Sequence, residues 1–362
     1  MAQTHAGTAD RPRWFFATPR EIVGADLETG ETFFRHALPF TLDGQSNAVV
    51  LTASDDGRFL AVAQAQGRSG AVLDVHAGTV ALRLARGDYH PEHCAYPLCF
   101  LDDRRLVHAV EWNQLAVTNV TTGERLDPRL DETKLDYFFG SLERSPSGSK
   151  LASTGWVWQP MGLIGTLDVE TWLRGPGEAA LQFSVDSDAW DLPMTWLDDE
   201  RIIACVLDFD RTQRLVVSKP GAEAPEVSIE QPIAAALAVR RDEVLLLGER
   251  TEAFDAHDLS RRGSLELRCH AWHPGTQEAL SFASLEGSGP WSLVSRPRSP
   301  VSVAAEIVSV AQREQENPSP QGRLVLADAL EAAGHHGEAL DHLRSEAAHG
   351  HRCFIVDDLA SG

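Results

Sequence analysis

Cysteine is scarce and unpatterned in this chain of 362 residues. The five cysteines are scattered, their number is odd, and no two of them form a Cys-x-x-Cys pair. A disulfide framework requires paired cysteines, and a zinc ribbon requires closely spaced ligands, so the sequence favours neither. We therefore expect a protein of a reducing compartment, the cytoplasm.

Long apolar runs and an excess of basic residues are also missing. No stretch of about eighteen apolar residues occurs, and the first 13 residues are polar, so we expect neither secretion nor membrane insertion. The chain has 32 Lys and Arg against 53 Asp and Glu, which gives a formal net charge of −21. Because so acidic a chain has few clustered cations to replace phosphate counterions, we expect no nucleic-acid partner.

Familiar catalytic motifs do not occur either. The sequence has no Gly-x-Ser-x-Gly elbow, His-Glu-x-x-His helix, phosphate-binding glycine loop or dinucleotide fingerprint. Residues 90–94 (His-Pro-Glu-His-Cys) and 349–353 (His-Gly-His-Arg-Cys) carry metal-type ligands, but a zinc site needs convergent ligands with a supporting shell. We interpret both as solvated segments and predict no catalytic residue, no metal site and no cofactor.

What the chain does have is a repeat, best seen in residues 46–86. Four short runs of β-branched and aliphatic residues alternate there with turn-forming residues, which is typical of a four-stranded antiparallel meander. A sheet with two apolar faces cannot stand alone. Stacking such units of about forty residues around an axis gives a β-propeller.

Six further segments follow the same pattern, so we predict an all-β protein, a β-propeller of seven four-stranded blades. The other six units span residues 10–35, 96–124, 145–169, 194–221, 233–267 and 269–295. The first unit lacks its innermost strand and the last unit lacks an outer one. Residues 1–10 or 298–304 are expected to supply any closing strand.

Two turn signals recur in phase with the strands. An Asp, Gly or Pro break separates the first and second strands, and an Asp-x-x-Thr-Gly motif or a relative of it follows the third, as at residues 26–30, 74–78 and 119–123. In that motif glycine can adopt the left-handed turn conformation. A two-sheet sandwich is the alternative, but sandwiches rarely keep such a phase.

These units resemble WD-repeat and YVTN-type bacterial propellers, and the resemblance covers about residues 11–297. The Gly-His and Trp-Asp dipeptides of strict WD repeats are absent, so the chain looks like a divergent relative. The resemblance implies the propeller fold and names no partner.

The pattern changes to helical spacing after residue 299, so we predict a propeller over residues 1–299 and a small α-helical domain over residues 300–362. The run Arg323 to Glu331, with Gly334 and residues 338–340, resembles the bacterial "repeat-companion" domain, although Leu326 and Ala329 replace its Tyr and Trp. The resemblance implies a bacterial source and association with repeats. We expect Leu324, Leu326, Ala327, Leu330, Leu340 and Leu343 to share one apolar side.

Tryptophans and carboxylates collect in loops that one propeller face would share, namely the second-to-third-strand loops and the blade-to-blade loops. Exposed tryptophans can anchor a partner, since each offers a large apolar area and an N–H donor. Packing between blades is the alternative role. The predicted partner-binding residues are Trp112, Trp156, Trp158, Trp190, Asp208 and Asp210.

The leading hypothesis is therefore a non-catalytic bacterial propeller that acts as a scaffold and binds another protein through this acidic, tryptophan-bearing face. Two alternatives remain. One is a propeller enzyme, such as a metal-dependent hydrolase or a lactonase-like catalyst. The other is a sensor that binds a small ligand in the axial funnel. The predicted innermost strands carry little ionisable content, which weakens the enzyme hypothesis.

Overall fold

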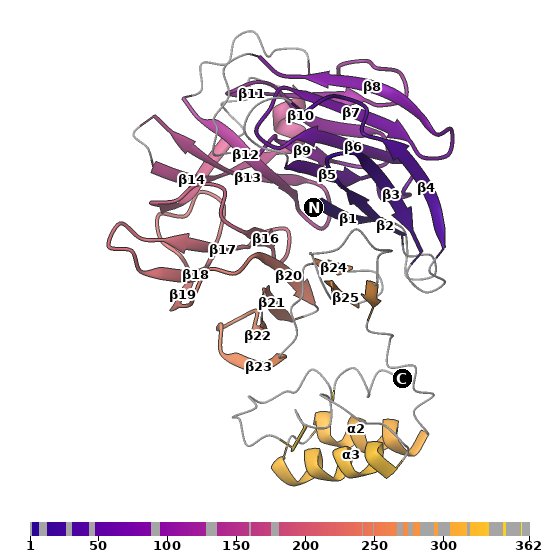
Figure 1. Cartoon of the computed structure of the whole chain (residues 1–362). Coiled ribbons are helices and arrows are strands. Elements are labelled where there is room, and N and C mark those ends of the chain that lie inside the picture. The colour runs from indigo at the N-terminus through magenta and orange to yellow at the C-terminus, as the bar shows by residue number, and fades with distance from the viewer. Residues whose placement is uncertain are drawn as a thin grey trace. The chain divides into compact units, whose positions relative to one another are not determined.

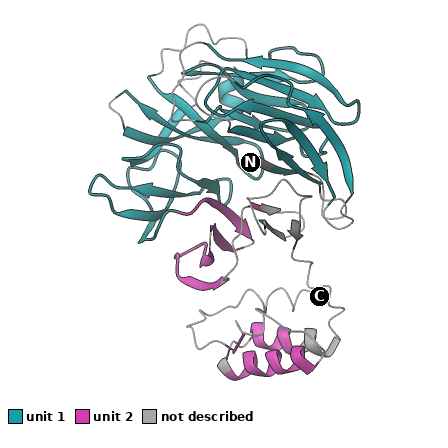
Figure 2. Ribbon diagram, viewed as in Figure 1, with its two compact units in different colours: residues 1–233 teal, residues 234–362 magenta. Residues whose placement is uncertain are grey.

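The computed structural model of the chain is shown in Figure 1. It describes residues 2–6, 13–26, 31–42, 48–87, 95–127, 136–158, 161–174, 181–240, 242–248, 250–265, 271–273, 278–282, 293–295, 305–316, 319–332, 343–344 and 356. These residues contain seven antiparallel sheets and three helices longer than one turn. The chain divides into two compact units, residues 1–233 and residues 234–362 (Figure 2).

Unit 1 contains five sheets, each a blade formed from consecutive strands. Blade one contains β1 (Ala2–Ala6), β2 (Arg13–Ala17), β3 (Glu21–Ala25) and β4 (Thr32–Ala37). Blade two contains β5 (Val49–Ala53), β6 (Phe59–Gln64), β7 (Ser69–Asp74) and β8 (Thr79–Ala85). Blade three contains β9 (Leu98–Phe100), β10 (Arg105–Glu111) and β11 (Gln114–Asn119). Blade four contains β12 (Phe138–Arg144), β13 (Lys150–Val157), β14 (Met161–Asp168), the helix α1 (Val169–Arg174) and β15 (Leu181–Ser187). Blade five contains β16 (Met194–Trp196), β17 (Ile202–Leu207), β18 (Gln213–Ser218) and β19 (Val227–Glu230).

Unit 2 contains two sheets and two helices in its described residues. Blade six contains β20 (Ala236–Arg240), β21 (Glu243–Leu247), β22 (Thr251–Asp255) and β23 (Arg261–Leu265). Blade seven contains β24 (Ala271–His273), β25 (Glu278–Phe282) and β26 (Leu293–Ser295). The helices are α2 (Ala305–Glu316) and α3 (Pro320–Ala332). The predicted domain boundary at residue 299 lies outside the described residues and stays a prediction.

Strand order follows chain order in every sheet, and the seven predicted blades are present. Five of them have the predicted four strands, whereas blades three and seven have three strands in the described residues. Blade one is completed by β1, which pairs with β2 from Ala2↔Ala17 to Ala6↔Arg13. The closing strand of this blade thus comes from residues 1–10, one of the two predicted sources. In unit 1 the first strands of successive blades contact one another, β1 with β5, β5 with β9, β9 with β12 and β12 with β16. First strands are therefore the inner strands of this unit.

The middle strands are buried on both faces, which is why the blades must stack. All six residues of β6 are buried, and Leu60, Ala61 and Val62 have no exposed surface. Alternate residues of β6 join different apolar clusters: Leu60 packs with residues of blade one, and Ala61 with residues of blade three. The strand β6 therefore contributes to two inter-blade cores.

Glycine takes the left-handed conformation at the predicted turns. Between first and second strands, Gly57 has φ +66° and Gly148 has φ +75°. After third strands, Gly78 has φ +66° and Gly123 has φ +72°, and the side chains of Asp74 and Asn119 accept the backbone N–H groups of the turn. In blade six the equivalent residue is Leu259 at φ +56°, a conformation that a leucine rarely adopts. The three turns after third strands thus share one geometry with different residues, since the N–H of Gly78, Gly123 and Leu259 each donates to the carbonyl four positions earlier.

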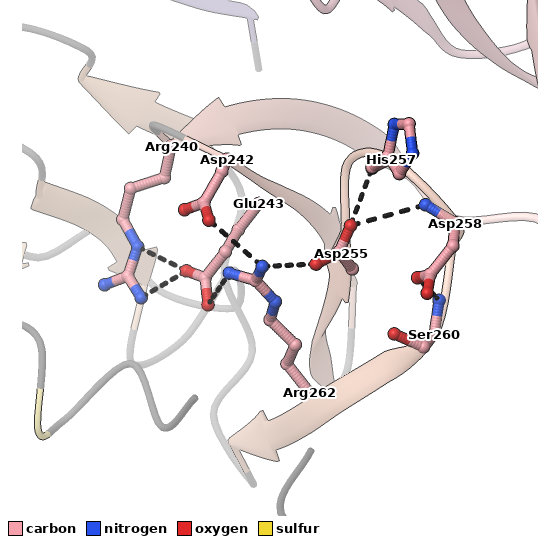
Figure 3. Close-up of polar contacts among 8 residues, drawn as sticks. All are labelled: Arg240, Asp242, Glu243, Asp255, His257, Asp258, Ser260 and Arg262. Carbon is pink, nitrogen blue, oxygen red and sulfur yellow. Dashed lines mark hydrogen bonds and ion pairs between the residues drawn. The ribbon is translucent and has the colours of Figure 1, made fainter. Parts of the chain in front are cut away.

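A network of buried charges fixes the turns of blade six (Figure 3). Arg240 donates to Glu243 Oε2 at 2.9 Å and 2.5 Å. Arg262 lies 3.4 Å from Glu243 Oε1 and 3.0 Å from Asp242 Oδ2, and it also pairs with Asp255. The side chains of Arg240, Glu243 and Arg262 are at most 8% exposed. Because a lone buried charge is destabilising, each member of the network depends on the others.

The helices α2 and α3 form a hairpin with a capped second helix. Ser319 precedes Pro320 at the start of α3, and its hydroxyl accepts the Gly322 N–H at 2.9 Å. Glu314 of α2 in turn accepts the Ser319 backbone N–H at 2.5 Å. The predicted apolar face is confirmed for residues 326, 327, 330 and 343, which are buried. Residue 340 lies outside the described residues.

The prediction that Leu324 belongs to this apolar face is wrong, because the residue is 39% exposed. At 100° per residue, position 324 lies about 120° from Leu330 around the helix axis and therefore at the edge of the buried stripe. Leu326 and Ala327 both lie within about 60° of Leu330 and are fully buried.

Deletion of residues 2–6 should destabilise blade one. The deletion would leave the inner edge of β2 unpaired and would uncover Trp14, which is 1% exposed and contacts the His5 ring edge-on at 5.8 Å. We expect the melting temperature to fall by about 5 °C or more and the tryptophan emission to shift to the red. Removal of Met1 alone is the control, and equal melting curves for all three chains would contradict the role of β1.

Leu330→Ala should destabilise the helical hairpin by about 2 to 5 kcal/mol, because the buried side chain would leave a cavity. Leu324→Ala is the matched control, since the same truncation at a partly exposed position should cost less than about 1 kcal/mol. Hydrogen exchange of residues 305–332 measures both effects locally. Equal exchange in the two variants would show that Leu330 does not anchor this packing.

Candidate functional site

The four predicted tryptophans lie at one end of blades three and four. Trp112 occupies the turn between β10 and β11, Trp156 lies near the end of β13, Trp158 follows β13, and Trp190 follows β15. In an antiparallel blade the second-to-third-strand turn and the loop to the next blade lie at the same end. One expectation needs correction, because Trp156 is a strand residue, paired with Phe138 and Gly162, and not a loop residue.

These tryptophans meet in a stack that includes a residue not predicted, Phe138 of β12. Phe138 lies 4.2 Å from Trp112 and 4.1 Å from Trp156, and Trp156 lies 4.9 Å from Trp190, between ring centroids. Trp158 lies 5.9 Å from Trp156 and 6.2 Å from Phe138. We call these five rings the aromatic stack.

Burial within the aromatic stack is graded. Phe138 is 1% exposed, and Trp112, Trp156 and Trp190 are half-buried. Trp158 is 62% exposed, the most exposed of the large apolar side chains in the described residues. From the sequence, the tryptophans could either anchor a partner or pack within the protein. Three of them pack, and the fourth, Trp158, presents its ring to solvent.

Small residues allow the aromatic stack to form. Gly162 lies opposite Trp156 in β14, and a Cβ at this position would lie 2.3 Å from the Ala189 carbonyl oxygen. The backbone that leads to Trp190 can therefore cross close to β14 only because residue 162 is glycine. Ser187 helps to hold the same backbone segment in place, since its hydroxyl accepts the Ala189 N–H at 3.1 Å.

Asp191 holds the loop of Trp190 in place and was not singled out in the sequence. Its Oδ1 accepts the Ser141 hydroxyl at 2.5 Å and the Thr154 hydroxyl at 3.1 Å, and its Oδ2 accepts the Ala95 N–H at 3.1 Å. One carboxylate thus joins blade three, blade four and the loop to blade five. A small cavity of about 20 Å³ adjoins Asp191, enough for one water molecule.

Backbone strain collects beside the aromatic stack. Four non-glycine residues of the described chain have positive φ, and three of them lie at this end of blades four and five: Val185 at +54°, Asp191 at +54° and Arg211 at +73°. Val185 is the extra residue of a bulge in β15, opposite Leu163 and Ile164. Each such conformation costs about 1 to 3 kcal/mol, so the surrounding contacts must impose it.

The two predicted aspartates lie in the turn between β17 and β18 and differ in character. Asp208 is half-buried and pairs with Arg214 at 2.7 Å. Asp210 is exposed, and the backbone N–H and hydroxyl of Thr212 hold its pKa below the usual value. Between them, Phe209 is 61% exposed.

This turn is linked to the loop of Trp190. The Asp188 N–H donates to the Leu207 carbonyl at 2.7 Å, and the Asp188 carboxylate pairs with Arg211 at 3.0 Å. The predicted residues of blades three, four and five therefore belong to one continuous rim. We call this rim, with the aromatic stack and the 207–213 turn, the aromatic face.

The inner strand β12 carries an ionisable group that the sequence interpretation missed, Glu143. The residue is exposed by its accessible surface, yet desolvation by neighbouring protein atoms raises its pKa to about 7, partly offset by the charge of Arg144 and a hydrogen bond from Thr195. Burial also raises the pKa of the nearby Cys99 thiol to about 12. A neutral thiol is a poor nucleophile and a poor metal ligand.

The candidate metal ligands do not converge within the described residues, where no group of three His, Cys, Asp or Glu side chains could hold an ion. His108 is buried, its pKa is lowered to about 4 by desolvation, and its ring nitrogens contact the Ala109 carbonyl and the Thr118 hydroxyl. It is a satisfied core histidine. Residues 90–94 and 349–353 lie outside the described residues.

Comparison with solved structures identifies the architecture. U3-55K matches with a TM-score of 0.55 at 12% identity, covering 77% of this chain and 86% of that chain. The RRP9 WD40 repeats match with a TM-score of 0.55 at 11% identity over the same shares. The fold is a WD40-type β-propeller. The β-propeller domain of Cps50 (Swd1) from Myceliophteria thermophila matches with a TM-score of 0.52 at 14% identity, covering 79% of this chain and 93% of that chain.

Sequence comparisons add no closer assignment to this WD40-type propeller. No protein-family model and no curated protein matches the chain. Within the described residues, no helix is long and apolar enough to cross a membrane.

Glu143→Gln should stabilise this propeller in a pH-dependent way. Because the folded state raises the pKa of Glu143 from 4.5 to about 7, the folded state binds this proton more tightly, and its stability falls as pH rises from about 4.5 to about 7. Glutamine removes that loss. We expect equal melting temperatures near pH 4.5 and a gain for the variant that reaches its maximum above pH 7. A gain that is independent of pH would contradict a raised pKa.

Proposed function

We propose that this WD40-type propeller is a non-catalytic scaffold that binds another protein through the aromatic face. The observation that carries the proposal is the position of Trp158. Its ring adjoins the stacked rings of Trp156 and Phe138 but remains exposed to solvent, and core packing does not require such an exposed ring. Large aromatic residues supply much of the binding energy at protein interfaces, and they do so best when a rigid support holds them in place. The aromatic stack is such a support.

Energetic features of the face favour binding over plain core packing. Trp156 Nε1 is buried without a hydrogen-bond partner among the described residues. An unsatisfied buried donor costs about 1 to 3 kcal/mol, and the left-handed backbone of Val185 adds a similar penalty. A loop under selection for stability alone would avoid both. Such concentrations of strain are found where a surface is shaped for a ligand.

The fold supports the same proposal in general terms. WD40-type propellers commonly serve as protein-interaction scaffolds. The net charge of −21 favours a partner with a basic surface. We propose a bacterial, cytoplasmic setting and assign residues 300–362 to a helical domain of the repeat-companion type, on the resemblance of residues 323–331.

Trp158→Ala should remove partner binding without unfolding the protein. Because the ring is 62% exposed, its loss should change the melting temperature little, while loss of an anchor should weaken binding about 30-fold or more. Trp156→Ala should instead cost about 3 kcal/mol of stability, since that ring lies between two others.

A photo-crosslinking amino acid at position 158 would identify the partner in cells. The same amino acid at Phe33, an exposed aromatic position on β4 of blade one, is the control. Affinity of the identified partner is then measured for the parent and for Trp158→Ala. Identical crosslinks from both positions, or an unchanged affinity in the variant, would refute binding through the aromatic face.

A further inference from the structure

The rings of the aromatic stack are nearly parallel, and this restricts what can bind them. The interplanar angles are 9° for Phe138 and Trp156, 18° for Trp156 and Trp190, and 23° for Trp156 and Trp158. Trp112 is inclined by 33° to Phe138. Parallel rings present one flat face at the exposed end. They do not form a box of rings set at right angles around a cavity.

Charge at this face favours a cation. Arg211 of the 207–213 turn and Arg214 of β18 already pair with Asp188 and Asp208. Three exposed carboxylates, those of Glu111, Asp186 and Asp210, have no ion pair with any described residue. The aromatic face therefore combines π faces with unneutralised negative charge, which attracts cations on both counts.

The flat shape of this aromatic surface favours some cationic side chains over others. An ammonium or methylammonium group is round and is held best by several rings around it. A guanidinium is planar, stacks in parallel on a single ring, and directs its N–H groups sideways toward carboxylates. An open, flat indole with acidic groups on the same rim thus matches arginine better than lysine or methylated lysine.

The chain itself places a guanidinium over an aromatic ring at three other positions among the described residues. The guanidinium carbon of Arg86 lies 4.7 Å from the Tyr96 ring centroid, and that of Arg58 lies 4.9 Å from the Phe59 ring. Arg13 lies 5.4 Å from the Phe33 ring. In each of these pairs the cation comes from this chain, whereas no described cation covers Trp158.

We infer that the partner inserts an arginine side chain that stacks on the exposed face of Trp158, with carboxylates of the same rim accepting its N–H groups. The inference rests on the proposed function and specifies its chemistry. The partner is then a protein with an accessible arginine, and recognition depends on the shape of the guanidinium as well as its charge.

Short peptides test this directly, using the full chain labelled with ¹⁵N at the tryptophan indoles. The probes are acetylated Gly-Ser-Arg-Ser-Gly peptides in which arginine is kept or replaced by lysine, trimethyllysine or citrulline. Trp158→Phe assigns the Trp158 indole signal. We expect the arginine peptide to shift this signal and to bind about fivefold more tightly than the lysine peptide, with citrulline weakest because its planar group is neutral.

Variants separate stacking from charge. Trp158→Ala should abolish the preference for arginine over lysine, while Asp186→Asn should weaken all cationic peptides and leave the preference in place. Equal affinity for arginine and lysine would overturn the inference, and tighter binding of trimethyllysine would do the same. If none of the peptides binds but position 158 still crosslinks a partner whose affinity depends on Trp158, the arginine inference fails and the proposed function stands.

Discussion

Each blade of this protein has two apolar faces, and the need to cover both governs the rest of the structure. The six residues of β6 are all buried, and neighbouring residues along the strand belong to cores on opposite sides. Hydrogen bonds within a sheet cannot satisfy that requirement; only another blade can. Once the blades stack, packing covers their faces, and the surface left for recognition consists of the two ends of the strands and the outer strands.

The two strand ends of the blades in unit 1 differ in the contacts that their loops make. At the end of the first-to-second-strand turns, side chains link neighbouring blades: the Asp56 N–H donates to Asp103 Oδ1 at 2.8 Å, and the Ser147 N–H donates to Asp199 Oδ1 at 2.9 Å. Arg144 adds a bidentate bond to Asp55. Polar groups there are directed at one another. At the opposite end Asp191 links the blades, and of the five rings of the aromatic stack it is Trp158 that faces solvent.

The repeat could be predicted because its signals are local. The Asp-x-x-x-Gly turns and the alternation of apolar runs each occupy a few residues, so Gly78 and Gly123 indicated their own conformations. The predicted gathering of tryptophans on one face followed from topology alone, since loop ends coincide in any antiparallel blade. Trp156 was assigned to a loop, although its spacing from Trp158 places both rings on the same side of a strand, because a strand that continues past its buried portion looks like a loop in sequence.

Phe138, Glu143 and Asp191 could not be recognised in the same way, because their roles depend on residues far along the chain. Phe138 matters through Trp112 and Trp156, which lie 26 residues before it and 18 after it. Asp191 acts on Ala95, 96 positions earlier. No turn or periodicity marks such a residue. A signal did exist for Phe138 in the aromatic run Tyr137-Phe138-Phe139, but a run of this kind is equally consistent with a buried strand.

The exposure of Trp158 is best understood together with the cost of the loop beneath it. A flexible tryptophan could bury itself by folding back onto a neighbouring ring, yet here Phe138 and Trp190 already stack on Trp156 at 4.1 Å and 4.9 Å. The Gly162 crossing and the Asp191 carboxylate hold the Trp190 loop in that arrangement. Because the support is rigid before any partner arrives, little side-chain entropy is lost on binding, and a single exposed ring can then act as an effective anchor.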